Sequence, residues 1–596
     1  MIEIITKEGI SLDLKSNIDI EYTLEQPLMA SDNMPVGIST TIAFPLSVTN
    51  RKVFGYWKGA FVGAINHTIP AKMLVNGIVV LDGELTFIGA SEDDIEYSFR
   101  GAELPSCVEG KVYELPELEI ISKSELFYES RSTGREDIAF PFMIRKTYVA
   151  ECEHQKGTGT YYPSSENGYA ITNAACNIAD KYVNYGTGRV GSVAVVRVLW
   201  LLRKAFPNII VEEEILDILS KLVIVAPNSA TEDRHYDIQE GPYDEGDRNV
   251  LDLAKALPEI SYADFLSNVL KMFAASVYAS GQHLQIKSAE SIFKNTDYVD
   301  WSQKASNVTS VSVEEAQAYE LSFANSPESS NDNSKGVGDD DIQVCANLEE
   351  LFTYFNSHSE IVNAWVAGYP DLFAGKKVDV SLTYDTVFSG VNIGWKWVGP
   401  LVPQPIIDNV NHLGAKSIMV DSSNAETFNY KIDFNCVRCV PAHIQSKRDV
   451  DEPSSVGKKV MCPVLDLPNP EGDRSSDIYI GLLIDNQVIP YGNLYTGHNW
   501  IGTSTSAGTE RTNDYSISIS GDNGLYSKFH KQFAKWITKR KHSFKMEVLL
   551  DISDIANLDL SRKVMIHNQL FIIKSATIKI NSQRGIGLSE VELIEI

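Results

Sequence analysis

The stretch KVMIHNQLFIIKSATIKI (563–580) decides the fold of this chain, because it predicts a β-hairpin. An apolar strand opens on Lys, the polar pair His567-Asn568 makes the turn, and a second apolar strand returns. KMLVNGIVVLDGELTFI (72–88) repeats this order near the other end, with Asn76-Gly77 at the turn. Asn-Gly between apolar runs is a strong hairpin signal, because both turn residues must accept a positive φ. Similar small β modules at both ends favour a structural subunit over a catalyst.

The residues around each hairpin extend these modules. Leu525 to Lys541 (LYSKFHKQFAKWITKRK) predicts one amphipathic helix, and SFKMEVLLDI (543–552) and GLSEVELIEI (587–596) predict strands. Residues 1–105 alternate with a period of two between Gly, Pro and Asn breaks, which is typical of a small barrel or sandwich. We therefore assign one β module to residues 1–105 and another, with one helix, to residues 471–596.

The middle of the chain contains the helical signals. SVAVVRVLWLLRKAF (192–206) and VEEEILDILSKL (211–222) predict helices, the second with its acidic residues in the first turn. Ser261 and Asp264 resemble a capping box before an apolar stripe, so a helix should run from there to about Gly281. HLQIKS (283–288) should follow as a strand. These elements predict a central α/β domain at residues 106–325.

The remaining segments are less regular. SPESSNDNSKGVGDDD (326–341) has almost no apolar residue and predicts a flexible linker at 326–342. NLEELFTYFNSH (347–358) predicts a short helix, and short strands should dominate the rest of a second middle domain at 343–470. The fold class is therefore α+β, mostly β, with several domains.

Composition limits the possible functions. The chain has 596 residues and a formal net charge of −27, so three to five domains are expected and its main task is not to wrap duplex DNA or coat an anionic membrane. No basic segment followed by an apolar run opens the sequence, and no apolar run reaches the roughly 18 residues of a membrane span. The 7 Cys are odd in number and scattered, which fits reduced, structural thiols.

One grouping resembles a metal site. Cys436 and Cys439 have the CxxC spacing, with His443 and Cys462 downstream, and zinc would suit such a set. The preceding YKIDFN alternates as a strand, however, which would put Cys436 and Cys439 on opposite faces. Buried structural thiols are the favoured interpretation, and neither a metal nor another cofactor is expected.

No segment predicts catalysis. Cys152 and His154 lie close in sequence, but a cysteine nucleophile needs an oriented base and no family-like sequence surrounds them. The acidic segments Glu212–Glu214, 230–247 and Asp339–Asp341 lack the order of a calcium loop. Phosphate-binding, dinucleotide, metalloprotease and serine-hydrolase motifs are absent. We therefore expect that the chain is not an enzyme and has no catalytic residues.

Three segments carry a family resemblance. PVGISTTIAFPLSVTNRKVFG (35–55) followed by AKMLVNGIVVLDGELTF (71–87), together with 524–580, resembles the end modules of tail-tip or baseplate-hub proteins from phages and prophages of Bacteroides-like bacteria. LPEISYADFLSNVLKMFAASVY (257–278), with YVDWSQK (298–304), fits the same pattern.

The resemblance implies a structural virion protein, made in the bacterial cytoplasm and located in the phage tail. Three copies would form a ring whose two tube-like β-barrel modules per chain join the tail tube and distal tail to a tip, spike or fibre. DNA would pass transiently through its channel without specific binding, and the chain would not insert into a membrane. One alternative is a receptor- or glycan-binding tail protein, with Trp395, Trp397 and Trp500 as candidate contacts. The other is a tail-associated cell-wall hydrolase.

Overall fold

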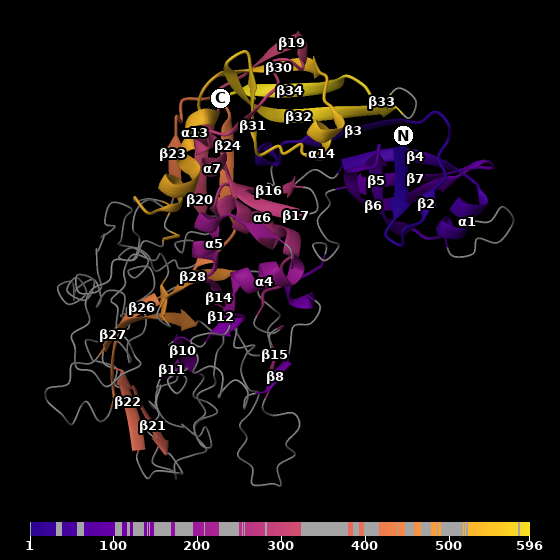
Figure 1. Cartoon of the computed structure of the whole chain (residues 1–596). Coiled ribbons are helices and arrows are strands. Elements are labelled where there is room, and N and C mark those ends of the chain that lie inside the picture. The colour runs from indigo at the N-terminus through magenta and orange to yellow at the C-terminus, as the bar shows by residue number, and fades with distance from the viewer. Residues whose placement is uncertain are drawn as a thin grey trace.

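The structure is a computed structural model of the whole chain. It describes residues 2–30, 38–55, 65–101, 110–115, 120–122, 136–139, 141, 143–147, 168–172, 195–207, 209–225, 250–252, 254, 257–280, 283–323, 380–385, 392–397, 417–437, 439–446, 458–465, 478–484, 487–489, 516–517, 519, 522–581 and 585–596. The fold is mostly β, with several sheets and short helices, as predicted (Figure 1). None of the helices in this described part is long and apolar enough to cross a membrane.

The N-terminal sheet has six strands in the order β2-β1-β5-β6-β7-β4, curled into a half-barrel (Figure 1). All its pairings are antiparallel. The strands are β1 (Ile2–Thr6), β2 (Ser11–Leu12), β4 (Ile38–Pro45), β5 (Thr68–Val75), β6 (Ile78–Ala90) and β7 (Asp94–Gly101), and α1 (Val48–Phe54) connects β4 to β5.

The C-terminal sheet has eight strands. Six follow the order β18-β31-β32-β34-β30-β19, and β3 and β33 both pair with β32. Their bounds are β3 (Asp19–Glu25), β18 (Tyr298–Asp300), β19 (Ala305–Glu314), β30 (Lys541–Val548), β31 (Lys563–Ile566), β32 (Gln569–Asn581), β33 (Gly585–Ile586) and β34 (Ser589–Glu595). Among the described residues no pairing joins its end strands, so the predicted C-terminal barrel is not shown.

The chain connects four strands of each sheet in the same order. In the first, β4 leads through α1 to the β5–β6 hairpin, and β7 then inserts between β6 and β4. In the second, β30 leads through α14 (Ile552–Ala556) to the β31–β32 hairpin, and β34 inserts between β32 and β30. Both hairpin turns hold two residues at positive φ, 50° and 81° at Asn76-Gly77 and 50° and 68° at His567-Asn568. The two predicted hairpins are confirmed.

The two sheets are joined by β3 and share one core. β3 precedes β4 in the sequence, yet it pairs antiparallel with β32 over its whole length, from Asp19↔Asn581 to Glu25↔Ser575. Buried residues of both sheets, such as Phe44 and Phe99 of one and Val591 and Leu593 of the other, form one hydrophobic cluster. Residues 1–101 therefore contribute strands to both sheets.

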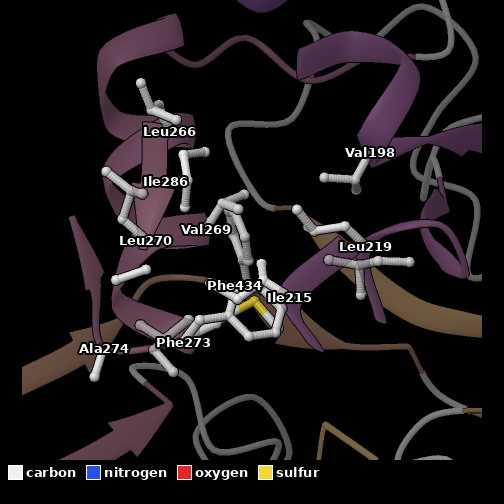
Figure 2. Close-up of a cluster of buried hydrophobic side chains, with 14 of the residues drawn as sticks. Val198, Ile215, Leu219, Leu266, Val269, Leu270, Phe273, Ala274, Ile286 and Phe434 are labelled. Atoms are coloured by element: carbon white, nitrogen blue, oxygen red, sulfur yellow. The ribbon is translucent and has the colours of Figure 1, made fainter. Parts of the chain in front are cut away.

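A second core fills the central region. It packs α4 (Val198–Ala205), α5 (Glu213–Leu219) and α6 (Tyr262–Met272) against strands (Figure 2). In Figure 2, Val269 and Phe273 approach Phe434 from α6, and Ile215 approaches from α5. α7 (Ala289–Lys294) lies against α13 (Lys531–Ile537), which also contacts this core.

Three predicted helices of the central region are shorter than expected, and the one at 211–222 forms α5 over Glu213–Leu219 alone. Residues 195–197 form β12 before α4, since the β-branched Val195 and Val196, together with Arg197, pair with the four-residue strand β14 (Leu222–Val225). α6 begins as predicted, with Ser261 accepting from the Asp264 amide, but it ends at Met272. Ala274 takes a φ of 42°, and 275–280 form β16 (Ala275–Ser280), paired with β17 (His283–Ser288).

The predicted helix Leu525–Lys541 is divided. Tyr526–His530 form a π-helix, η10, that continues into α13, and Lys541 already belongs to β30. The linker at 326–342 and the short helix at 347–358 lie outside the described residues.

The remaining strands form smaller sheets. Those of the central region are β8 (Ile120–Ser122), β9 (Ile138–Ala139), β13 (Ile210–Val211), β15 (Val250–Asp252), β20 (Ala318–Phe323), β23 (Ser417–Val420), β24 (Thr427–Ile432), β25 (Asn435–Cys436), β28 (Tyr479–Ile484) and β29 (Gln487–Ile489). A separate sheet holds β10 (Met143–Thr147), β11 (Gly168–Thr172), β21 (Val380–Asp385), β22 (Asn392–Trp397), β26 (Cys439–Ser446) and β27 (Lys458–Leu465). Single-turn 3₁₀ helices are η1 (Pro27–Met29) and η3 (Val112–Glu114).

Candidate assembly surfaces

The most exposed strand is β19, at the edge of the C-terminal sheet (Figure 1). It pairs on one side with β30, where Val311 lies opposite Phe544 and Val313 opposite His542. Every residue from 306 to 313 is exposed, and Val308, Val311 and Val313 keep 47%, 56% and 42% of their surface open to solvent. In the described part of the chain, no strand pairs with its other side.

Such an edge is normally protected. Open edges attract other strands, and proteins usually blunt them with Lys, Pro or very short strands. β19 is ten residues long, has neither Lys nor Pro, and carries its only charge on Glu314. Two register irregularities, at Ala305/Val308 and Val308/Ser310, are its single protective feature. A long edge of this kind is a candidate site for pairing with another chain.

The C-terminal sheet also presents a polar face, defined by residues that lie opposite one another across its strands. Glu590 of β34 faces Glu547 of β30 and Thr577 of β32, and Lys579 of β32 faces Glu21 of β3. This polar face carries more carboxylates than ammonium groups: Glu21, Glu25, Glu547, Glu590 and Glu592 against Lys545, Lys574 and Lys579.

An ion-pair network holds β19 to this polar face. Lys574 Nζ lies 2.7 Å from Glu314 Oε1 and 3.0 Å from Glu592 Oε1, and the Ser543 hydroxyl donates to Glu592 at 2.9 Å. Burial lowers the pKa of Lys574, but the two carboxylates outweigh burial and the pKa rises. Burial likewise raises the pKa of Glu592, and Lys574 and Ser543 more than offset it, so that pKa falls. These contacts link four strands, because Lys574 of β32 forms ion pairs with Glu314 of β19 and Glu592 of β34, and Ser543 of β30 adds a hydrogen bond.

The N-terminal sheet has a similar acidic outer face. Lys72 of β5 pairs with Asp82 of β6 at 2.9 Å, Glu84 lies two residues further along β6 opposite Arg100 of β7, and Glu96 lies on the same face of β7. Asp82 and Glu84 are partly buried and Glu96 is exposed. Both modules therefore present a face on which carboxylates predominate.

Buried lysines attach the C-terminal sheet to the central helices. Lys563 donates to the carbonyls of Phe293 and Asn295 at 2.8 and 2.6 Å, at the C-terminal end of α7. Lys541 donates to the carbonyls of Trp536 and Lys539 at the end of α13, at 3.1 and 3.2 Å. Cations satisfy the free carbonyls and the negative end of a helix dipole. Each lysine begins a strand of the sheet, so the sheet and the helices are fixed together.

His530 is the one buried histidine among the described residues. Its Nε2 lies 2.9 Å from the carbonyl of Met272, which can only accept, so Nε2 carries the proton. Nδ1 therefore accepts from the Tyr319 hydroxyl at 2.5 Å. Burial lowers the pKa of His530 to about 4, only partly offset by Met272, and burial raises the pKa of Tyr319 well above its ordinary value. Both groups are fully buried in aromatic packing, and His530 satisfies the Met272 carbonyl at the end of α6.

The residues weighed as metal ligands, for which no metal was expected, lie in two sheets. Cys436 is in β25, opposite Ile480, whereas Cys439 and His443 are in β26, opposite Pro463 and Lys459. Their side chains lie outside what the structure describes. No group of three or more potential metal ligands occurs among the residues that it does describe.

The other candidate residues are only partly covered. Glu212 accepts from the Ser288 amide at 2.7 Å, a structural contact, and Glu213 and Glu214 stand in the first turn of α5. The backbone of β22 includes Trp395 and Trp397, while Cys152, His154, Trp500, Asp339–Asp341 and 230–247 fall in undescribed parts. Neither β19 nor the role of His530 was predicted from the sequence. A run of alternating Val and Ser or Thr at 308–313 was the available signal for the first.

Comparison with known proteins gave matches among solved structures. The 43 kDa tail protein of prophage MuSo2 from Shewanella oneidensis is 8% identical, with a TM-score of 0.31 and coverage of 100% of this chain and 98% of that chain. The tail protein from Neisseria meningitidis MC58 is also 8% identical, with a TM-score of 0.30 and coverage of 100% and 96%. No family model and no curated protein matches.

Proposed function

We propose that this chain is a structural protein of a phage tail, a tip or baseplate hub that joins the tail tube to the tip. The observation that carries the proposal is the pair of β modules that share the order of four strands, one hairpin turn type and one core. Such a pair gives each chain two related building blocks for a ring. The resemblance of 35–55, 71–87 and 524–580 to hub proteins supports the same reading.

The exposed strand β19 supplies a means of ring closure. Its unpaired backbone groups and three exposed valines would pair with and pack on a neighbouring chain, which removes an edge that otherwise promotes aggregation. Closed rings satisfy every such interface, and three copies would place six related modules around one axis. We therefore propose a homotrimer.

The acidic faces suit the wall of a DNA channel. Phosphates are repelled by carboxylates, so a wall bearing Glu21, Glu547 and Glu590 would let DNA slide past without binding. The ring would bind the tail tube on one side and tip, spike or fibre proteins on the other, in the virion. We propose no enzymatic activity, no metal and no cofactor for this chain.

The test is the mass of the full-length chain in solution, by light scattering coupled to size-exclusion chromatography, with particle images by electron microscopy. A trimeric ring is expected. Val311→Lys with Val313→Lys should give monomers, because charges along the edge disfavour strand pairing. Met419→Lys is the matched control, since Met419 is 52% exposed on β23 and belongs to neither module. If the wild-type chain is a monomer at high concentration, the proposal is wrong.

A peptidoglycan zymogram addresses the hydrolase alternative, and a polysaccharide pull-down addresses the glycan-binding one. Clearing of peptidoglycan by the purified ring, or its retention on a host polysaccharide, would favour those functions instead.

A further inference from the structure

Within one chain, the two modules meet at a helix. α14 of the C-terminal module lies against β6 of the N-terminal sheet. Its residue Ile555 is 5% exposed in the shared core, and Ile552 packs against that core. Figure 1 shows α14 on the side of the C-terminal sheet that faces the N-terminal sheet. This helix is part of the seam between the modules.

α1 holds the equivalent position in the N-terminal module. It follows β4 as α14 follows β30, and each leads to its hairpin. Each is capped in the same way, since Ser47 accepts from the Asn50 amide at 3.2 Å and Asp551 from the Asp554 amide at 2.9 Å. Alignment of the two caps places Val48 at the position of Ile552.

The two equivalent residues differ in their surroundings. Ile552 is partly buried and packs against the shared core, whereas Val48 is 70% exposed, the highest value among the exposed large hydrophobic residues of the described part of the chain. Figure 1 shows α1 on the side of the N-terminal sheet away from the C-terminal one. α1 therefore resembles α14 in fold and capping but has no module against it among the described residues.

We propose that α1 docks on the C-terminal module of a second copy, with Val48 in the role that Ile552 has within the chain. β32 occupies in the C-terminal sheet the place that β6 has in the N-terminal sheet, so the receiving surface lies along β32 of the second copy. The contact within the chain would thus be repeated between chains. This inference rests on the proposed ring and names a contact between its chains in addition to the one proposed for β19.

The experiment places a benzophenone amino acid at position 48 of the full-length chain. Photolysis of a mixture of ¹⁵N-labelled and unlabelled protein, followed by mass spectrometry, separates crosslinks between chains from those within one. We expect crosslinks between chains, from position 48 to peptides covering 563–581. The same probe at Met419 should give none to those peptides.

Substitutions give an independent readout. Val48→Lys should weaken assembly at least tenfold, while Val48→Ile, which copies Ile552, should preserve it. A wild-type monomer would overturn the proposed ring together with this contact. A wild-type ring whose position 48 crosslinks elsewhere or not at all, and whose Val48→Lys variant assembles normally, would overturn the contact alone. Crosslinks to an unrelated protein would also count against it.

Discussion

The hydroxyl oxygens of Thr23 and Thr577 lie 2.9 Å apart, although 554 positions separate them in the sequence. They face each other across β3 and β32, so the N-terminal part of the chain completes the C-terminal sheet. Gln26, just after β3, extends the seam by donating through Nε2 to the carbonyls of Leu560 and Ile573 at 2.9 and 3.1 Å. The two modules should therefore unfold as one cooperative unit.

Truncation of a side chain in β3 should destabilise both modules. Tyr22 is 3% exposed in the shared core. Tyr22→Ala should lower the free energy of unfolding by about 3–5 kcal/mol, as for other large aromatic truncations. Urea unfolding followed by hydrogen exchange should show lost protection in both sheets. Thr23→Val, on the exposed face of the same strand, should cost about 1 kcal/mol or less. Protection lost in the N-terminal sheet alone would contradict a shared unit.

The hairpin turn at Asn76-Gly77 predicts that two Gly→Ala substitutions in the N-terminal sheet differ in their effect on stability. Gly77 has a φ of 81° and nothing within 4 Å of an added Cβ, so Gly77→Ala meets only backbone strain. We expect a loss of about 1 kcal/mol in the free energy of unfolding. Gly89→Ala also meets nothing within 4 Å and has no positive φ, so it should be neutral or slightly stabilising. If the two substitutions changed the thermal unfolding temperature equally, the positive φ at Gly77 would not be the cause.

His530 predicts a dependence of stability on pH. Its pKa in the folded chain is about 4, against 6.5 for a free side chain, so the unfolded chain binds the extra proton between these values. The stability contribution is complete above pH 6.5 and is lost as pH falls from 6.5 towards 4, on the order of 3 kcal/mol in total. His530→Phe should flatten this slope in urea unfolding between pH 7 and 4.5. If the dependence of stability on pH is unchanged in this variant, titratable groups other than His530 cause it.

The sequence predicted what local patterns encode. The turns at Asn76-Gly77 and His567-Asn568, the cap at Ser261 and the strand at 283–288 follow from the allowed backbone conformations of a few residues. These are short-range effects, and the structure confirms them.

Long-range pairing was not predictable in the same way. β3 alternates like any strand, and nothing local indicates that it joins β32 instead of its neighbours β2 and β4. The end of α6 at Met272 depends on the pairing of β16 with β17 and on His530 from the C-terminal region. The exposure of β19 is likewise a property of the assembled sheet, because its own alternation of Val with Ser or Thr would equally suit a covered strand.

The polar face of the C-terminal sheet predicts how a ring would treat DNA. Glu547 and Glu590 lie directly opposite each other and are exposed, and Glu21 is exposed two strands away. The triple change Glu21→Lys, Glu547→Lys and Glu590→Lys should make the ring retain duplex DNA in a gel at about 50 mM salt and release it at higher salt, because neutralised phosphates give up counterions.

The wild-type ring should not retain DNA at either salt concentration. The matched control changes Glu8, Glu92 and Asp93 to Lys, which alters the net charge equally at exposed turn residues of the N-terminal sheet. If that control retains DNA as strongly as the polar-face variant, retention reflects net charge alone and the polar face is no channel wall. Retention by the polar-face variant alone, with the trimeric mass unchanged, would place these carboxylates where DNA passes.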